Sequence, residues 1–332
     1  MPNPSIRTAV IAALLFPLLV DSVLAQGNAR ADMGQYPSRP VRMIVPLAPG
    51  GGSDIVGRIL ALELAGLWGQ TVVVDNRPGA GSTVGTAIAA KSPADGHTTL
   101  VSSSSIAISP ALYQGLPFDV RRDFTGVTLI ASQPSMLAVH SSVSAASLPE
   151  LIALAKAQRG KLTYASAGPG SATHLGTELL KYAAGIEVLH VPYRSAGQAT
   201  TALLTGEAQI LLTNMASVLP HLKSGRIKAL GVSSAKRSPL APEVPTIAEA
   251  GVPGFEYMTW YGMLVPAGTP RPIVERIQAD TAKIIQASQT RGRFSTQGLD
   301  VYGNSPSEFQ AYLGAELAKW DKVIRATGVR VE

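Results

Sequence analysis

The chain has 332 residues, of which 46% are hydrophobic and 15% charged, with a formal net charge of +6 and no cysteine. The lack of cysteine excludes disulfides, thiolate metal sites, a cysteine nucleophile and a lipid-modified N-terminal cysteine. The basic residues are scattered, so no nucleic-acid surface is indicated, and the composition is that of a soluble chain able to bury one large core or two moderate ones.

The first 25 residues have the three-part pattern of a secretory signal peptide. Arg7 precedes an apolar run at 9–20, and Val23-Leu24-Ala25 fits the small-residue rule at a cleavage site. The run is shorter than the roughly 20 residues of a membrane-spanning helix, and Pro17 and Asp21 interrupt it. We therefore predict a signal peptide over 1–25 and export of the chain. The alternative is an uncleaved N-terminal anchor.

Strand-like and helix-like segments alternate after the signal peptide. The first predicted strands are 41–45, 71–75 and 98–101. Ile55, Ile59 and Leu62 recur at helical spacing, which predicts a helix after Ser53. This order is typical of βαβ units, so we expect parallel strands with helices packed on the sheet.

The same alternation continues from Ser135 to the C-terminus. Further predicted strands are 136–139, 162–165, 188–191, 210–212, 227–232 and 259–265. Predicted helices cover 148–158 and 199–206, and two more follow residue 270. The last of these carries an apolar stripe expected in the core, formed by Phe309, Leu313, Leu317, Trp320 and Ile324. An α/β chain of about 300 residues in two clusters indicates two lobes.

Glycine-rich turns lead from predicted strands into predicted helices. VPLAPGGGSD at 45–54 and YASAGPGSATHL at 164–175 are two of them, and VPYRSAGQATTALL at 191–204 gives a third helix start near Ser195. Each leaves unpaired backbone N–H groups at the positive end of a helix, where an anion is favoured. We expect Gly51 and Gly168 to need small side chains because a ligand approaches the backbone there.

Other classes of site fit the sequence poorly. No phosphate-binding loop with its lysine occurs, and GAGSTVG at 79–85 carries Val84 where a dinucleotide-binding loop needs its third glycine. The nucleophile elbow G-x-S-x-G is absent, and the histidines show no metal-binding spacing. Ser53 and Ser171 are interpreted as helix N-caps rather than nucleophiles. We expect no enzyme activity and no cofactor.

Six segments in order resemble the Bug family, the extracytoplasmic solute receptors of tripartite tricarboxylate transporters. They are YPSRPVRMIVPLAPGGGSDIVGR, VVVDNRPGAGSTVGT, YASAGPGSATHLGTELL, VPYRSAGQATTALLTGE, VPTIAEAGVPGFE and TWYGMLVPAGTP. The resemblance covers the chain from about Tyr36 onward. It implies a two-lobed α/β periplasmic-binding-protein fold of type II, with a ligand cleft between lobes that the chain crosses twice. Lobe 1 would hold 36–134 and 256–332, and lobe 2 would hold 135–255, with hinges near 134 and 256.

The resemblance also implies a small carboxylate held by backbone amides, hydroxyls and water. The positions carried over are Pro49, Gly51, Gly52, Ser53, Asp54, Ser104, Ser105, Ser166, Gly168, Ser171, His174, Tyr193 and Arg194. Two roles fit His174, lining the cleft or bonding the start of its own helix. Arg194 fits either a carboxylate contact or a salt bridge across the lobe.

One departure from the family predicts ligand preference. Many relatives carry aspartates where this chain has Gln209 and Thr213, and Thr213 follows a predicted strand toward the cleft. Threonine cannot pair with an ammonium group as a buried aspartate can. We therefore expect a preference for an amine-free acid, such as a dicarboxylate or an aromatic acid, over acidic amino acids.

The favoured function is a periplasmic receptor that captures an organic carboxylate and delivers it to a membrane transporter. A sensory binding protein that partners a signalling receptor is the alternative, followed by a secreted α/β enzyme. The expected partners are the small organic carboxylate and membrane transporter subunits or a sensor, with no nucleic acid. We expect a monomer.

Overall fold

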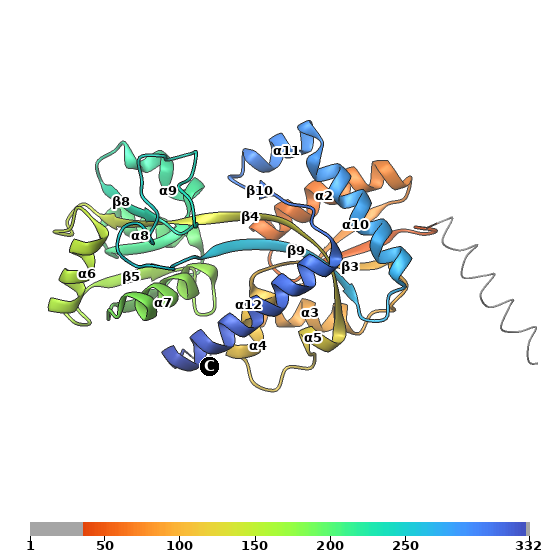
Figure 1. Ribbon diagram of the computed structural model, residues 1–332, viewed down its shortest axis with the longest axis horizontal. Helices are drawn as coiled ribbons and strands as arrows, with labels where there is room; N and C mark the ends of the chain where they lie inside the picture. The colour runs from red at the N-terminus through yellow and green to blue at the C-terminus, as the bar shows by residue number, and fades with distance from the viewer. Residues whose placement is uncertain (1–35, 330–332) are drawn as a thin grey trace, which may run out of the picture.

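The computed structural model describes residues 36–329 and places them in two α/β lobes joined by two long strands (Figure 1). The predicted signal peptide at 1–25 lies outside the described residues. The joining strands are β4 (Phe124–His140) and β9 (Met258–Pro266). No helix among the described residues is long and apolar enough to span a membrane.

The sheet of lobe 1 has the order β2-β1-β3-β9-β4, with the short β10 also paired to β4. Its remaining strands are β1 (Val41–Val45), β2 (Val72–Asn76), β3 (Thr98–Ser103) and β10 (Asp300–Val301). Strands β1, β2 and β3 are parallel, as the βαβ pattern predicts, and β9 runs antiparallel to β3. The carboxyl ends of β1 and β3 therefore meet at one edge of the sheet.

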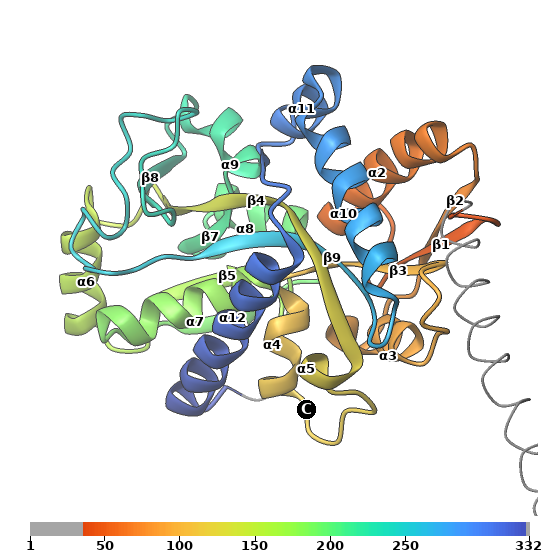
Figure 2. The same cartoon turned by 45° about the vertical axis from the view of Figure 1, so that its right-hand side comes forward.

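The helices of lobe 1 come from both ends of the chain (Figure 2). They are α2 (Gly52–Trp68), the 3-10 turn η1 (Ala80–Ser82), α3 (Thr83–Ala90), α4 (Ser105–Leu112), α5 (Val120–Asp123), α10 (Arg271–Gln286), α11 (Ser288–Ser295) and α12 (Pro306–Thr327). Three helices follow β9, whereas the sequence predicted two, because Ala287 separates α10 from α11 with an extended backbone.

The sheet of lobe 2 has the order β4-β7-β5-β6, and β8 also pairs with β4. Its strands are β5 (Thr163–Ser166), β6 (Leu189–Pro192), β7 (Ile210–Asn214) and β8 (Ile227–Val232). Its helices are α6 (Leu148–Ala157), α7 (Ala172–Ala184), α8 (Ala196–Thr205) and α9 (Met215–Leu222). Strand β5 is parallel to β6 and β7, so α7 and α8 begin at the carboxyl ends of β5 and β6.

Strand β4 changes partners midway along its length. Residues 124–134 pair with β9 in lobe 1, and residues 135–139 pair with β7 in lobe 2. The sequence predicted only 136–139 of this strand, because Gly126, Ser132 and Gln133 interrupt the apolar run of its first half. The change of partner supports the proposed lobe boundary at 134/135.

Helix α12 spans the two lobes. It packs against α4 of lobe 1 and α7 of lobe 2. Its predicted stripe from Phe309 to Ile324 is buried, with Phe309 and Trp320 fully enclosed. Trp260 on β9 donates a hydrogen bond of 3.0 Å to Glu316 of this helix. The helix therefore braces the joining strands.

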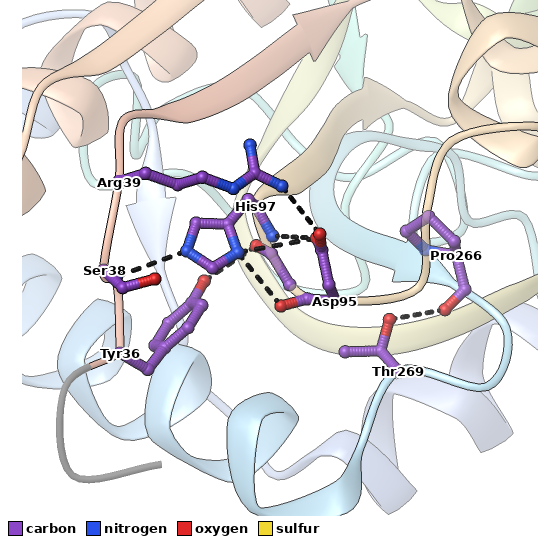
Figure 3. A network of polar contacts seen from close by, with 8 residues as sticks. Tyr36, Ser38, Arg39, Asp95, His97, Pro266 and Thr269 are labelled. Carbon is purple, nitrogen blue, oxygen red and sulfur yellow. Dashed lines mark hydrogen bonds and ion pairs between the residues drawn. The ribbon is translucent and has the colours of Figure 1, made fainter. Parts of the chain in front are cut away.

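The first described residues are fixed to lobe 1 by a polar network (Figure 3). The Tyr36 hydroxyl donates to the Gly96 carbonyl at 2.7 Å, and the Ser38 amide donates to His97 Nε2 at 3.3 Å. Arg39 pairs with Asp95 at 2.7 Å. The start of lobe 1 is thus anchored by contacts outside the cavity described below.

Candidate ligand-binding site

A cavity of about 340 Å³ lies between the lobes. Its lining comes from the loops after β1, β2 and β3, from the loop before α7, and from β9. The lining residues are Leu47, Gly52, Ser53, Gly81, Ser103, Ser105, Pro169, Gly170, Ser171, Ala172, Thr259 and Tyr261. None of these side chains is charged, so an anion bound here must be compensated by dipoles and hydrogen bonds.

The start of α2 offers unpaired amides to this cavity. Its N-cap is Gly51, and no side chain caps the helix. The first amide donating within the helix is Ile55, to the Gly51 carbonyl at 3.0 Å. Within the described residues, the amides of Gly52 and Ser53 have no hydrogen-bond acceptor. Two donors at the positive end of a 17-residue helix therefore belong to residues that line the cavity.

Ser53 provides a second sign of a ligand at this place. Its side chain is 1% exposed, and its Oγ has no hydrogen-bond partner among the described residues. The sequence interpretation of Ser53 as an N-cap is wrong, because Gly51 occupies that position and Ser53 lies inside the first turn. A buried hydroxyl without a hydrogen-bond partner destabilises the protein, and a ligand that accepts its hydrogen bond removes that penalty.

Asp54 serves the loop rather than the cavity. Its Oδ2 accepts from the Gly50 amide and from Arg58 Nε, both at 2.9 Å. Burial alone raises the pKa of this carboxyl, but the Arg58 and Gly50 hydrogen bonds outweigh it and lower the pKa below its usual value. The carboxylate thus stays ionised and holds the glycine turn in place.

Two of the serines at 102–105 reach the cavity. Ser103 and Ser105 line it, and their Oγ atoms are 2.9 Å apart, so one hydroxyl donates to the other. The other hydroxyl proton is left to a ligand. Ser104 is buried and does not line the cavity, although its amide donates to the Trp260 carbonyl at 2.9 Å.

The loop before α7 has most of its amides paired with side chains. The Ala167 amide donates to Thr173 Oγ1 at 2.8 Å, and the Gly168 amide donates to Ser166 Oγ at 3.0 Å. The Gly170 amide donates to His174 Nδ1 at 3.1 Å. Ser166, Gly168 and His174 therefore shape this loop, while Pro169, Gly170, Ser171 and Ala172 line the cavity.

Behind the loop lies a stack of aromatic rings. The rings of His174 and His190 are 4.3 Å apart, and Tyr164 stacks on His190 at 4.8 Å. Ser166 Oγ is 2.6 Å from His190 Nε2. Burial, with His190 as the next cause, lowers the pKa of His174 to about 4, and burial lowers that of His190 as well. His174 is therefore neutral at ordinary pH and can accept from Gly170.

The third predicted helix start does not contribute to this cavity. Ser195 caps α8 by accepting from the Gln198 amide, and the Arg194 amide donates to Gln198 Oε1 at 3.1 Å. The Arg194 side chain is exposed. Tyr193 lies behind the lobe-2 loop, where its carbonyl would be 3.3 Å from a Cβ added at Gly168.

Thr213 also lies outside the cavity lining. It is 1% exposed, and its Oγ1 donates to Asn214 Oδ1 at 3.2 Å. It pairs with Met136 of β4 in the sheet of lobe 2. The prediction that Thr213 faces the ligand stays a prediction.

The close approach falls on Gly52 and not on Gly51. A Cβ at Gly51 would meet only the Ala48 carbonyl, at an ordinary 3.5 Å, whereas a Cβ at Gly52 would collide with the Tyr261 hydroxyl. Pro49, Gly51 and Asp54 surround the loop without lining the cavity. Sequence reasoning missed Tyr261 and Thr259, although both lie in the quoted segment TWYGMLVPAGTP.

A second cavity of about 470 Å³ lies beside β10 and the loop after β8. Lys236, Arg237, Glu256 and Asp300 line it, so charges of both signs are present. Arg237 already pairs with Glu249 at 2.8 Å. Of these two cavities, as residues 36–329 form them, the smaller is the better candidate because it has unpaired helix amides and a buried unpaired hydroxyl. No cluster of metal ligands occurs within residues 36–329.

Comparison with known proteins places the chain among solute receptors. A sequence model of the family described as "Tripartite tricarboxylate transporter family receptor" matches residues 56–329. Protein BugT of Bordetella pertussis is 36% identical over 299 residues, which cover 90% of this chain and 92% of BugT. A UPF0065 protein in the tcbD-tcbE intergenic region of Pseudomonas sp. strain P51 is 38% identical over 319 residues, which cover 96% of this chain and 94% of that protein.

Solved structures agree with these sequence matches. Rpa4515 of R. palustris with adipate has a TM-score of 0.78 at 34% identity, covering 89% of this chain and all of that one. The periplasmic binding protein BugD has a TM-score of 0.76 at 31% identity, with 89% and 100% coverage. MatC of Rhodopseudomonas palustris with bound malate has a TM-score of 0.76 at 30% identity, covering 87% of this chain and all of MatC.

Proposed function

The chain belongs to the tripartite tricarboxylate transporter receptor family, and we propose that it captures an amine-free dicarboxylate in the cavity between its lobes. The fold is that of a periplasmic binding protein, and the protein is a solute-binding receptor for small carboxylates. The identity of the carboxylate and the atoms that hold it are the parts that we propose.

The observation that carries the proposal is the start of α2. It combines two amides and the Ser53 Oγ, none of which has a partner among residues 36–329, in a cavity whose lining residues there are uncharged. A carboxylate supplies acceptors for all three donors and carries the charge that the helix end favours. A neutral ligand supplies acceptors without that charge, so it gains less.

The start of α7 provides the opposite wall. Ser171 and Ala172 line the cavity, and the Ala172 amide has no acceptor among residues 36–329. A second carboxylate therefore fits at this wall, across from the first. The relatives Rpa4515 and MatC have been solved with adipate and malate, which are both dicarboxylates.

The lining also argues against acidic amino acids. No aspartate or glutamate belongs to it, so an ammonium group would lie in a partly dry site without a counter-charge. This supports the same preference that the sequence suggested from Thr213, but on different residues.

The family match supports the proposal that the protein delivers its ligand to membrane transporter subunits. The predicted signal peptide at 1–25 would bring the protein to the periplasm. Binding would close the lobes about β4 and β9, since ligand contacts come from both sides. Solution scattering with saturating ligand should then give a smaller radius of gyration.

A sensory role predicts the same closure with a signalling receptor as partner, so pull-down with the transporter subunits separates the two functions.

An enzyme function finds little support in the site. Ser166 and His190 form a hydroxyl–imidazole pair at 2.6 Å, but Ser166 is fully buried and does not line the cavity. We propose binding without turnover. Recovery of chemically intact ligand after prolonged incubation with the protein checks this.

The experiment that tests the proposal is a thermal-shift and calorimetry series with mono-, di- and tricarboxylates, aromatic acids, aspartate and glutamate. At a ligand concentration about 100 times Kd, binding stabilises the protein by roughly 2.7 kcal/mol, which moves the melting temperature measurably. We expect an amine-free dicarboxylate to bind tightest. Tighter binding of glutamate than of every amine-free acid would contradict the proposal.

A further inference from the structure

Tyr261 lies where a joining strand meets the start of α2. It sits on β9, opposite Ser103 of β3 and Ala131 of β4. Its ring belongs to the core of lobe 1, and the residue is only 4% exposed. The residue lines the cavity, and its hydroxyl packs so closely on Gly52 that no side chain fits between them. The hydroxyl therefore lies beside the unpaired amides of α2.

The hydrogen bond from Gln133 sets the direction of this hydroxyl. Gln133 is 7% exposed on β4, and its Nε2 donates to Tyr261 Oη at 3.2 Å. An amide nitrogen has no lone pair to offer, so Oη is the acceptor and its own proton must point elsewhere. No acceptor for that proton occurs within the described residues. Burial raises the pKa of Tyr261 to about 12, so the proton is retained at ordinary pH.

We propose that Tyr261 is a specificity-determining residue that donates a hydrogen bond to the carboxylate at the start of α2, and that Gln133 is the positioning residue that aims it. This inference rests on the proposed function. Tyr261 then offers the ligand a donor, because Gln133 occupies the lone pair that would accept. A group with two acceptor atoms and no proton, such as a carboxylate, accepts from both the α2 amides and Tyr261, whereas an ammonium group places a donor against these donors.

The two residues also lie on the strands that join the lobes. Tyr261 and Gln133 lie on β9 and β4, the two strands that connect the lobes. A ligand that bonds to Tyr261 therefore contacts a strand that connects the lobes as well as the start of α2.

The first test is Tyr261→Phe, with Tyr36→Phe as its matched control. Both tyrosines are buried in the same core, but the Tyr36 hydroxyl donates to the Gly96 carbonyl away from the cavity. Loss of a hydrogen bond to a charged group should weaken the Kd for the tightest dicarboxylate about ten- to a hundredfold in Tyr261→Phe. Tyr36→Phe should lower the melting temperature and leave the Kd unchanged.

The second test is Gln133→Glu against Gln133→Leu. When ionised, the carboxylate that Gln133→Glu introduces would accept a hydrogen bond from the Tyr261 hydroxyl. The lone pairs of Oη would then point toward the ligand, and the new negative charge would repel the ligand's carboxylate. The Kd of this variant should be at least as weak as that of Tyr261→Phe and should improve as the pH falls from 8 to 6, since the buried carboxyl takes up a proton. Gln133→Leu should weaken binding less, and its Kd should not depend on pH. A purely structural role of Gln133 would not produce this difference between the two variants.

The outcomes separate the two claims. If the wild type binds dicarboxylates but folded Tyr261→Phe keeps its Kd within twofold, this inference is overturned and the proposed function stands. A Gln133→Glu variant with wild-type affinity and a flat pH profile also overturns it. If the wild type binds none of the acids tested, both are overturned.

Discussion

The starts of α2 and α7 look alike in sequence but differ in what they offer a ligand. Each follows a strand and a glycine-rich turn, and each lines the same cavity. At α2 no side chain caps the helix, and the amides of Gly52 and Ser53 have no acceptor among the described residues. At α7 the amides of Gly168 and Gly170 are bonded to Ser166 and His174. The start of α2 therefore offers a ligand two amides and the Ser53 hydroxyl, whereas the start of α7 offers it the Ala172 amide while the amides of Gly168 and Gly170 hold the loop in shape.

The difference shows that glycine alone does not make an anion site. A helix start becomes one when its neighbours leave the amides free, and nearby serine, threonine or histidine side chains decide that. We therefore assign the main carboxylate contact to α2 and a positioning role to the lobe-2 loop.

The largest expected effect comes from Gly52→Ala. A Cβ there collides with the Tyr261 hydroxyl, so the helix start and the Tyr261 ring must move apart, which displaces the donors that we assign to the ligand. Loss of two hydrogen bonds to a charged group should cost about 3 kcal/mol or more of binding free energy, read by calorimetry.

Gly66→Ala is its control, since it lies in the same helix with open space around it. That variant should gain about 0.5–1 kcal/mol of stability and keep its Kd. A folded Gly52→Ala variant with wild-type affinity would refute the assignment to α2.

The next effect is a pH dependence of stability that the lobe-2 loop should show. The pKa of His174 is about 4 in the folded protein, below its ordinary value near 6.5. The unfolded chain takes up the proton first, so stability is complete above pH 6.5 and falls as the pH drops toward 4. His174 should account for a loss of about 2–3 kcal/mol in the free energy of unfolding over this pH range. The measurement is chemical denaturation of the wild type and of His174→Asn at each pH, and the wild type should lose more stability by that amount.

A smaller effect should follow from removing the acceptor for Gly170. His174→Ala leaves that amide unbonded, and the loosened loop should weaken ligand binding by about tenfold, as expected for the loss of one hydrogen bond. His174→Asn places an amide oxygen near the position of Nδ1 and should restore most of the affinity. Equal binding by His174→Ala and the wild type would show that the loop does not need this bond.

Much of the fold could be predicted from sequence, because short apolar runs and turn residues mark nearly every strand and helix. The first half of β4 could not, since Gly126 and Ser132 hide a strand whose pairing is supplied by distant β9 and β10. In the candidate site, the segments 45–54 and 164–175, which the sequence singled out, contribute residues to the cavity lining. Which amides stay free could not be predicted, because that depends on whether a side chain such as His174 accepts their hydrogen bonds.

The smallest expected effect is that of Arg194→Ala. The side chain is exposed and does not line the cavity, so we expect the Kd to change by no more than about twofold. A tenfold loss would show that lobe closure brings the guanidinium to the ligand, which would restore the contact that the sequence suggested.

A crystal structure with the tightest dicarboxylate bound tests the central claim most directly. We predict one carboxylate within hydrogen-bonding distance of the Gly52 and Ser53 amides and of Ser53 Oγ, with Tyr261 Oη as a further donor. The amides of Gly168 and Gly170 should remain bonded to Ser166 and His174. A ligand held instead by Lys236 and Arg237 in the second cavity, with the start of α2 unoccupied, would contradict this account.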